Sequence, residues 1–535
     1  MDSTTDVVVV GGGAAGLFAA ARLREAGLAV VVVEASGLLG GSTATDTGQF
    51  WLPATHLASR LGGADSPEDA LTYLDAILGE VTPSSSAGRR ESFVRSADDV
   101  ARWLDGNRFG LAPVKGRVDF HPEAAAARRG GRSLMAQHFD RRLLGPLGPL
   151  LRDKDYDLEI APRSPRGVAT ATSVLARRLI NPTKDMVTGG AALAGRLLLR
   201  ASMLGAKLWV NSELLELNTD SGRVIGVRVR REGREVELEA RLGVILACGG
   251  FEGNDEMRRE YLPLPTDAAW TSGLAGNTGT GIRAAAAVGA TLAGMDEAWW
   301  TLVARFGGKT YRMTSERTQP HGIVVDRAGD RFFDEAGPVP EVGQALYDRN
   351  RRVRAIPSYL IVDNRHRQRY RMGPWLPGSN PNADNDAIVR AQSLADLATA
   401  LKIDTAGLLG TVVRFNGLAA KGSDSDFRRG ASPVDRAHGD PLNRKNPCLG
   451  TLERSPYWAV PLYPGDAGTK GGVLVDADAR VLSGNSPIPG LYAVSGVAAS
   501  LFKSTSPGVG AATASALVDA HRAVAHLSGE PVRQG

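Results

Sequence analysis

Three glycines near the start of the chain, with an acid soon after them, are residue types that bind a diphosphate and a ribose. Gly11, Gly13 and Gly16 have the spacing GxGxxG, and Glu34 follows eighteen residues after Gly16. In such a motif the first glycine permits a tight turn, the second lets the backbone approach a pyrophosphate, and the third lets helix and strand pack closely. An acid at this distance accepts hydrogen bonds from ribose hydroxyls. The pattern predicts dinucleotide binding.

The residues around the motif predict the elements that position it. Valine runs at 7–10 and 30–33 are typical of buried parallel strands, and residues 17–26 between them favour a helix. The first turn of that helix presents free N–H groups and a partial positive charge to phosphates. Glycines placed between two strands and a helix are a far more specific signal than the glycine spacing alone.

Two later segments repeat the combination of an apolar strand and glycines. Residues 243–250 (GVILACGG) predict another parallel strand whose end meets the nucleotide, or a strand that simply ends in a tight turn. Residues 490–494 and 506–512 predict a strand, a glycine loop and a helix that extends to about residue 527. Because the first and last segments of the chain both belong to one nucleotide domain, the region between them contains an insertion.

We therefore predict an α/β fold with a Rossmann-like FAD-binding domain, built from a parallel sheet and a small antiparallel sheet, and an inserted α+β cap domain. The length of 535 residues exceeds one ordinary core. The predicted boundaries are 1–298 and 466–535 for the FAD-binding domain and 299–465 for the cap. Residues 207–210, 213–218 and 223–230 are expected to be the strands of the small sheet.

Net charge, cysteine content and the length of apolar runs argue against several classes of function and site. The net charge of +5 is thin for this length, and no basic cluster interleaved with aromatics suggests nucleic-acid binding. Cys248 and Cys448 form no CxxC, so we expect neither a metal site nor a disulfide framework, and a reducing cytoplasm is the expected location. No apolar run approaches about 18 residues, so no transmembrane segment is expected.

Motifs spread over almost the whole chain resemble the 3-ketosteroid dehydrogenases, a branch of the fumarate reductase/succinate dehydrogenase flavoprotein superfamily. They lie at residues 40–44, 277–281, 296–300, 315–318, 328–332, 414–417, 457–460, 465–472 and 506–510. The resemblance implies a noncovalently bound FAD, since no histidine for a covalent link occurs between Gly41 and His56.

The glycine motifs and the resemblance together predict a set of FAD-binding residues. They are Gly11, Gly13, Ala14, Ala15, Gly16, Glu34, Ala35, Gly41, Ser42, Thr43, Gly48, Ala247, Cys248, Gly249, Asn277, Asp466, Gly468, Gly496, Gly510, Ala511 and Ala512.

The resemblance also implies a reaction. Members of the family oxidise a carbon–carbon bond next to a ring ketone: a tyrosine pair removes the α-proton, a third tyrosine and a backbone N–H polarise the carbonyl, and the β-hydrogen leaves as hydride to the flavin. In this chain the three tyrosine positions fall on Phe120, Val339 and Ser506, while the backbone donor falls on Gly510.

Four residues are candidates for the chemistry. Gly510 supplies the backbone donor, and Ser506 donates a hydrogen bond to a carbonyl or only begins a turn. His121 acts as an acid or base near neutral pH, or is a solvated loop residue. Tyr347 points inward from the cap, or packs with its hydroxyl satisfied.

Three functions fit these residues. The favoured one is an FAD-dependent dehydrogenase or ene-reductase that acts on the α,β carbons of a steroid, a terpenoid or a smaller alicyclic ketone. An alternative is a fumarate-reductase-like reduction of an unsaturated acid or enone, which predicts an arginine-rich anion pocket around Arg305. The third is a catalytically altered flavin-binding protein. The expected partners are a small hydrophobic carbonyl substrate and an electron acceptor of unspecified class.

Overall fold

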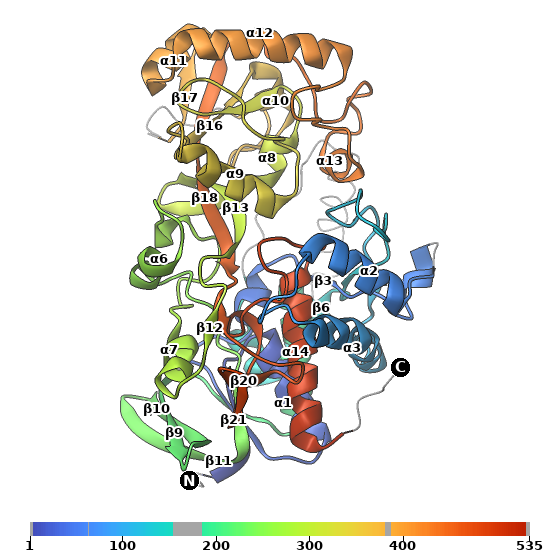
Figure 1. The fold of residues 1–535 in the computed structure, drawn as a ribbon, viewed down its shortest axis with the longest axis vertical. Coiled ribbons are helices and arrows are strands. Elements are labelled where there is room, and N and C mark those ends of the chain that lie inside the picture. The colour runs from blue at the N-terminus through green and yellow to red at the C-terminus, as the bar shows by residue number, and fades with distance from the viewer. Residues whose placement is uncertain (1–3, 62–63, 154–184, 380–386, 531–535) are drawn as a thin grey trace.

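A computed structural model gives the fold, and residues 4–61, 64–153, 185–379 and 387–530 are described. Two lobes are stacked along the long axis (Figure 1). Both chain ends belong to the lower lobe, which contains the glycine motifs, and the upper lobe is built from the middle of the chain (Figure 1).

The lower lobe is organised around a sheet whose strands follow the order β20-β21-β11-β1-β2-β8. The central strand β1 pairs in parallel with β2 and with β11, so that Val7 lies opposite Val30 and Gly243. The strands are β1 (Thr4–Val10), β2 (Val30–Val33), β8 (Lys207–Trp209), β11 (Arg234–Leu246), β20 (Arg480–Ser483) and β21 (Ser486–Ala493). Strand β8 was expected in the small sheet, but it extends the parallel sheet because it pairs with β2.

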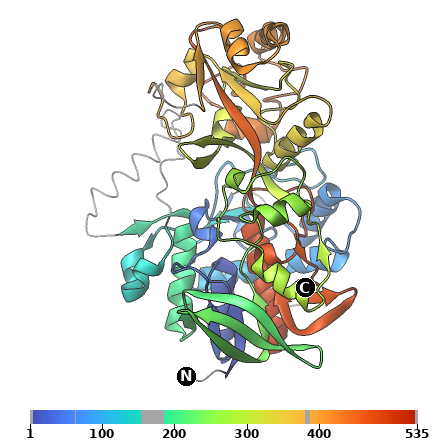
Figure 2. The same cartoon turned by 90° about the vertical axis from the view of Figure 1, so that its left-hand side faces the viewer.

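The valine runs are buried on both faces of this sheet, as a parallel sheet requires. Val7 and Val9 pack in one apolar core with helices, whereas Val8 and Val10 pack in a second core with the strands β9 (Ser212–Asp220) and β10 (Arg223–Arg231). These two strands continue antiparallel from the first half of β11 (Figure 2). The lobe therefore has three layers: helices, parallel sheet and a small antiparallel sheet.

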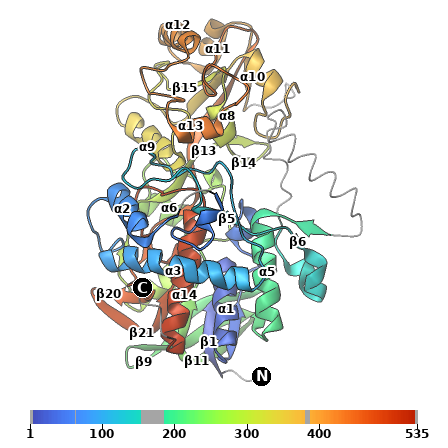
Figure 3. The same ribbon diagram turned by 90° about the vertical axis from the view of Figure 1, so that its right-hand side faces the viewer.

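The helical layer covers the other face of the parallel sheet, where α1, α3, α5 and α14 lie together (Figure 3). The helices of the lower lobe are α1 (Ala14–Glu25), α2 (Pro67–Leu78), α3 (Ala87–Gly106), α5 (Gly189–Met203), α6 (Asp255–Tyr261), α7 (Thr280–Ala287) and α14 (Ala511–Ser528). Small two- and three-stranded sheets join the loops: β3 (Gln49–Trp51) with β5 (Ser133–Met135) and β4 (Ala112–Pro113), β6 (Phe139–Asp140) with β7 (Met186–Val187), and β12 (Leu292–Ala293) with β19 (Gly472–Val473).

The upper lobe contains a second sheet, with the order β14-β13-β18-β16-β15 and β17 paired to β18. Its strands are β13 (Ala298–Phe306), β14 (Lys309–Arg312), β15 (Gly322–Val325), β16 (Ser358–Val362), β17 (Val389–Ala391) and β18 (Tyr457–Thr469). Its helices are α8 (Thr314–Thr318), α9 (Val339–Asn350), α10 (Asn364–Arg369), α11 (Leu394–Leu401), α12 (Thr405–Lys421) and α13 (Pro433–His438). The predicted α/β fold with an inserted α+β cap is confirmed.

The long strand β18 runs from the upper lobe down to the lower lobe (Figure 1). Together with β13 it carries the chain across the join between the lobes, close to the predicted boundaries at 298 and 466. Within the described ranges, no helix is long and apolar enough to cross a membrane. The same ranges contain no group of three or more His, Cys, Asp or Glu side chains placed to hold a metal ion.

Candidate active site

The glycine motif lies at the carboxyl edge of the parallel sheet, where the strands β1, β2 and β11 end side by side. The Gly11 N–H donates to the carbonyl of Val33 at 2.8 Å, and the Ala247 N–H donates to the carbonyl of Val10 at 2.7 Å. The ends of β1, β2 and β11 therefore bring residues 11–16, Glu34 and 247–249 to one edge, as in other open α/β sheets that bind a ligand there.

The three motif glycines differ in what surrounds them. Gly11 has φ +114°, and a Cβ there would lie 2.4 Å from the Ala247 carbonyl oxygen. A Cβ on Gly16 would lie 2.0 Å from the Gly11 oxygen. The side of Gly13 is open, because the nearest atom to its Cβ position is the Gly41 Cα at 3.8 Å. Gly11 and Gly16 are glycines for packing, and Gly13 leaves room for a ligand.

Two helices begin at this edge without a capping side chain. Gly13 is the N-cap of α1 and Gly510 the N-cap of α14, and no side chain of the described residues caps either helix start. The first N–H groups of a helix have no partner within it, so both ends offer free donors and a partial positive charge. These N–H groups include those of the predicted residues Ala14, Ala15, Ala511 and Ala512.

Glu34 is fixed beside the motif. Its Oε2 accepts from the Gly12 N–H at 2.8 Å, and its Oε1 accepts from the backbone and hydroxyl of Ser36. A carboxylate has about four acceptor positions, so one remains for a ribose hydroxyl. Ala35 follows in the same loop. The open flank of Gly13, the two uncapped helices and the oriented acid together fit the FAD that the sequence implies.

A second glycine loop faces the first. Gly41 lies against Gly13, since a Cβ on it would be 2.9 Å from the Gly13 Cα. Ser42 and Thr43 continue from Gly41 into a short 3₁₀ turn (Ser42–Thr45). The Asn277 amide donates to the Ser42 hydroxyl at 3.0 Å.

Other predicted residues join the same edge by close backbone contacts. A Cβ on Gly249 would lie 2.8 Å from the Asn277 side chain, and one on Gly496 would lie 2.6 Å from the Gly250 nitrogen. Gly48 faces the start of α5, where a Cβ would lie 2.2 Å from the Gly189 carbonyl carbon. The Cys248 thiol packs against α7, and burial raises its pKa to about 11.

Three groups of the protein hydrogen-bond to the Asp466 carboxylate. It pairs with Arg258 at 2.7 Å, both side chains being fully buried, and accepts from the Thr271 hydroxyl and the Gly468 N–H. These contacts hold Asp466 and Gly468 at the join between the lobes, and their contact with the cofactor stays a prediction.

Glu252 lies beside this pair and next to Asn277, whose amide donates to its Oε1 at 2.6 Å. Burial and the nearby Asp466 carboxylate raise the pKa of Glu252 to about 7. Because the folded state favours the protonated acid, this group stabilises the fold fully below its ordinary pKa of 4.5, and that contribution is lost as the pH rises through about 7.

We expect Glu252→Gln to reduce the loss of stability between pH 5 and pH 8 by about 2–3 kcal/mol relative to the wild type. The amide keeps an oxygen that accepts from Asn277 but cannot ionise. Urea unfolding midpoints at the two pH values measure the effect, and Glu91→Gln, which changes a half-exposed carboxyl on α3, is the control. An equal pH dependence in Glu252→Gln and wild type would contradict this prediction.

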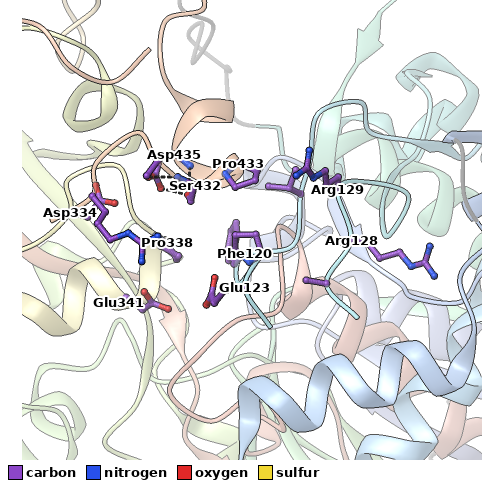
Figure 4. A pocket seen from close by; sticks show the side chains of 15 residues that line it. Phe120, Glu123, Arg128, Arg129, Asp334, Pro338, Glu341, Ser432, Pro433 and Asp435 are labelled. Carbon is purple, nitrogen blue, oxygen red and sulfur yellow. Dashed lines mark hydrogen bonds between the residues drawn. The ribbon is translucent and has the colours of Figure 1, made fainter. Parts of the chain in front are cut away.

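A cavity of about 490 Å³ lies where the two lobes meet (Figure 4). The lower lobe contributes the segment around Phe120 and Glu123, and the cap contributes Pro338 and Glu341 at the start of α9. The lining also includes charged residues: Arg128, Arg129, Asp334, Arg428 and Asp435. The volume suits a small organic molecule.

The segment that leads into α14 supports one wall of this region. The Phe120 N–H donates to the Pro507 carbonyl at 3.1 Å, and the Tyr73 hydroxyl donates to the same oxygen at 2.8 Å. His121 Nε2 lies 2.8 Å from the Thr505 hydroxyl. The Phe120 position and residues 505–510, which the family motif aligns, are therefore neighbours in space.

The candidate catalytic residues have different surroundings. The Gly510 N–H has no hydrogen-bond partner among the described residues, and Gly510 has φ +90°. The Ser506 side chain is buried and donates to the Gly508 carbonyl at 3.2 Å. Tyr347 donates to the Pro265 carbonyl at 3.3 Å and packs edge-on against Trp300. Neither side chain is among the described residues that line the cavity.

The anion pocket expected around Arg305 for the fumarate-reductase alternative is not at this cavity in the described part of the chain. Arg305 lies on β13 and donates to the Gly308 carbonyl of its own hairpin at 3.4 Å.

Sequence reasoning missed three residues at this site. Glu341 lies 3.4 Å from His121 and lines the cavity. Tyr73, on α2, donates a hydrogen bond from its hydroxyl to the Pro507 carbonyl. Lys470 is buried over the Trp299 ring and donates to the carbonyls of residues 503 and 505, and burial lowers its pKa to about 7. Lys470 lies in a motif of the resemblance and Glu341 ends the segment that aligns Val339, but no local pattern in the sequence indicated the partner of any of the three residues.

Comparisons with known proteins show which family the chain belongs to. The sequence profile described as "FAD binding domain" matches residues 6–512. The 3-oxosteroid 1-dehydrogenase of Mycobacterium tuberculosis is 38% identical over 98% of both chains. The 4-oxocyclohex-2-ene-1-carboxylate 5-dehydrogenase of Sinomonas cyclohexanicum is 31% identical, covering 97% of this chain and 92% of that protein.

The structural comparison points the same way. The crystal structure of 3-ketosteroid Δ1-dehydrogenase from Sterolibacterium denitrificans, in complex with 1,4-androstadiene-3,17-dione, matches with a TM-score of 0.94 and 34% identity over 99% of this chain and 100% of that chain. This chain belongs to the FAD binding domain family and, within it, to the 3-ketosteroid dehydrogenase-like branch of FAD-dependent oxidoreductases.

Proposed function

We propose that this protein desaturates the α,β carbon–carbon bond of a cyclic ketone. The observation that carries the proposal is the position of the cavity. It lies between the lobes, and its lining residue Phe120 donates to Pro507 in the segment that leads to the start of α14. That segment ends at the Gly510 N–H, which has no hydrogen-bond partner among the described residues. The relatives named above act, by their names, on oxosteroids and on an oxocyclohexene carboxylate.

The residues have separable tasks. FAD, when bound, accepts the hydride that leaves the β-carbon. The Gly510 N–H donates to the ketone oxygen, which makes the α-proton acidic because fixed donors stabilise the developing oxyanion. Phe120, Pro338 and the neighbouring apolar residues exclude water from the ring of the substrate. A base within hydrogen-bond reach of the α-carbon takes the proton.

The lining favours a second candidate within this substrate class. Carboxyl and guanidinium groups from both lobes line the cavity, including Arg129 and Arg428, so a ring ketone with a polar or ionised substituent fits the charges better than a fully apolar one. A carboxylated alicyclic ketone is therefore the second candidate beside a steroid.

A reducing cytoplasm remains our predicted location, since Cys248 and Cys448 are free thiols.

We expect the holoprotein to be yellow and its flavin to be bleached anaerobically by a ketone of the correct class. The probes are 4-androstene-3,17-dione and 4-oxocyclohex-2-ene-1-carboxylate, with the corresponding alcohols as controls. Loss of the visible flavin band, with a product lighter by two hydrogen atoms in mass spectrometry, supports the proposal. A flavin that stays oxidised with every cyclic ketone, but is bleached by dithionite, would instead support the altered flavin-binding protein.

A further inference from the structure

A histidine and a glutamate from different lobes meet at the edge of the cavity. His121 Nδ1 lies 3.4 Å from Glu341 Oε1, and its other ring nitrogen, Nε2, lies 2.8 Å from the Thr505 hydroxyl. His121 follows Phe120 in the lower lobe, whereas Glu341 lies in the first turn of α9 in the cap. The pair therefore exists only because the cap is positioned over the lower lobe.

The pair is close in sequence to two of the positions where the family has tyrosines. Phe120 and Val339 occupy two of those positions, and each is a near neighbour in sequence of one member of the pair. Glu341 is among the residues that line the cavity (Figure 4). Thr505 anchors His121 to the segment that ends at Gly510, so the carboxyl group and the predicted carbonyl donor are tied to the same loop.

The surroundings make Glu341 a suitable base near neutral pH. The Glu341 side chain is about half exposed (49%), and its partial desolvation together with the neighbouring Glu123 carboxylate raises its pKa above the ordinary value, whereas burial lowers the pKa of His121. Glu123 also lies 3.7 Å from His121. The other charged groups facing the cavity are Asp334 and Asp435 from the cap, Arg129 and Arg428, and Arg128, which pairs with Asp65 and Asp69.

We propose that Glu341 is the base that removes the α-proton of the substrate, and that His121 is a positioning residue that holds its carboxylate. This inference rests on the proposed function. In the step, the α C–H bond breaks and a Glu341 O–H bond forms. The electron pair of that C–H bond becomes the new carbon–carbon π bond as the β-hydrogen leaves with its own pair to bound FAD. Glu341 then returns its proton to solvent through the open side of the cavity.

The deciding experiment compares Glu341→Gln with Asp348→Asn, an exposed carboxyl on the same helix α9. In anaerobic single-turnover mixing with 4-androstene-3,17-dione and with 4-oxocyclohex-2-ene-1-carboxylate, we expect Glu341→Gln to slow flavin reduction at least about 100-fold. We expect Asp348→Asn to leave the rate unchanged. A Glu341→Gln rate within a factor of two of the wild type would overturn the assignment.

The pH dependence of the rate of flavin reduction distinguishes a base from a residue that only packs, because a purely packing role of Glu341 would not affect it. The base must be ionised, so the wild-type rate rises with pH through about 7 and then levels off. Glu123→Gln removes a carboxylate that raises the pKa of Glu341, and so shifts this rise to lower pH. A rise that stays at the same pH in Glu123→Gln would count against Glu341 as the titrating base.

A test without turnover separates this inference from the proposed function. In NMR titrations of the holoprotein labelled at histidine, the signal absent from His121→Asn reports His121. We expect its titration to change in Glu341→Gln and not in Asp348→Asn. An unchanged titration overturns the pair even if a ketone bleaches the flavin. Flavin that no ketone bleaches, with a changed titration, rejects the proposed function and leaves the pair supported.

Discussion

Replacing Arg258 with Met is expected to lower the free energy of unfolding by about 3–5 kcal/mol, because it leaves the Asp466 carboxylate buried without its cation. Both side chains are fully buried and lie 2.7 Å apart. Asp466 lies on β18, the strand that crosses between the lobes, and Arg258 lies on α6. The variant should therefore also loosen the cap.

Chemical unfolding followed by flavin release and by circular dichroism measures this effect. Arg351→Met is the matched control, since it breaks an ion pair with Asp348 in which both partners are exposed, and it should cost less than about 1 kcal/mol. Arg258→Met combined with Asp466→Leu should recover part of the loss, because no buried charge is left unpaired. Equal stability of Arg258→Met and Arg351→Met would show that the buried pair does not hold the lobes together.

The second large effect is expected on cofactor binding. Gly13→Ala should weaken FAD binding by more than tenfold, a loss above about 1.4 kcal/mol, while the apoprotein remains folded. Gly13 has ordinary extended backbone angles and the space beside it is open in the protein alone. A methyl group therefore makes only an ordinary van der Waals contact, with the Gly41 Cα at 3.8 Å, but it occupies the space through which the backbone approaches the diphosphate.

FAD titration by fluorescence quenching and thermal unfolding of the apoprotein separate the two effects. Gly106→Ala, at the end of α3 with no atom within 4 Å of the new Cβ, is the control that should leave FAD affinity unchanged. Gly16→Ala should behave differently and unfold, since its Cβ would lie 2.0 Å from the Gly11 oxygen. Unaltered FAD affinity in Gly13→Ala would place the diphosphate elsewhere.

The parallel sheet was predictable because its signals are local. Continuous valines in β1 and β2 report burial on both faces, and the order of glycines reports a turn between a strand and a helix. The valines did not reveal that β8 would extend the parallel sheet, because three residues carry no information about which neighbour they pair with. Pairing of distant strands is decided by the packing of the whole lobe.

The predicted site likewise contains residues that a local pattern identifies and residues whose contacts only the packing of distant segments decides. Glu34 could be identified because its spacing from Gly16 is fixed by one strand and one helix. The expected cofactor contact of Asp466 stays a prediction, and no sequence pattern indicated that its carboxylate would pair with Arg258, 208 residues away in sequence. Tyr347 and Ser506 were plausible by residue type alone, and the structure satisfies both hydroxyls with backbone carbonyls.

By itself the sequence determined the nucleotide-binding edge, the inserted cap and the family, since each depends on residues close together in the chain or on motifs in a fixed order. Tertiary structure alone decided which side chains of the two lobes meet at the edge of the cavity. His121 and Glu341 are 220 positions apart in sequence, and no local pattern links them. They meet because the chain leaves the lower lobe at β13, builds the cap and returns along β18, which places the first turn of α9 over the Phe120 segment.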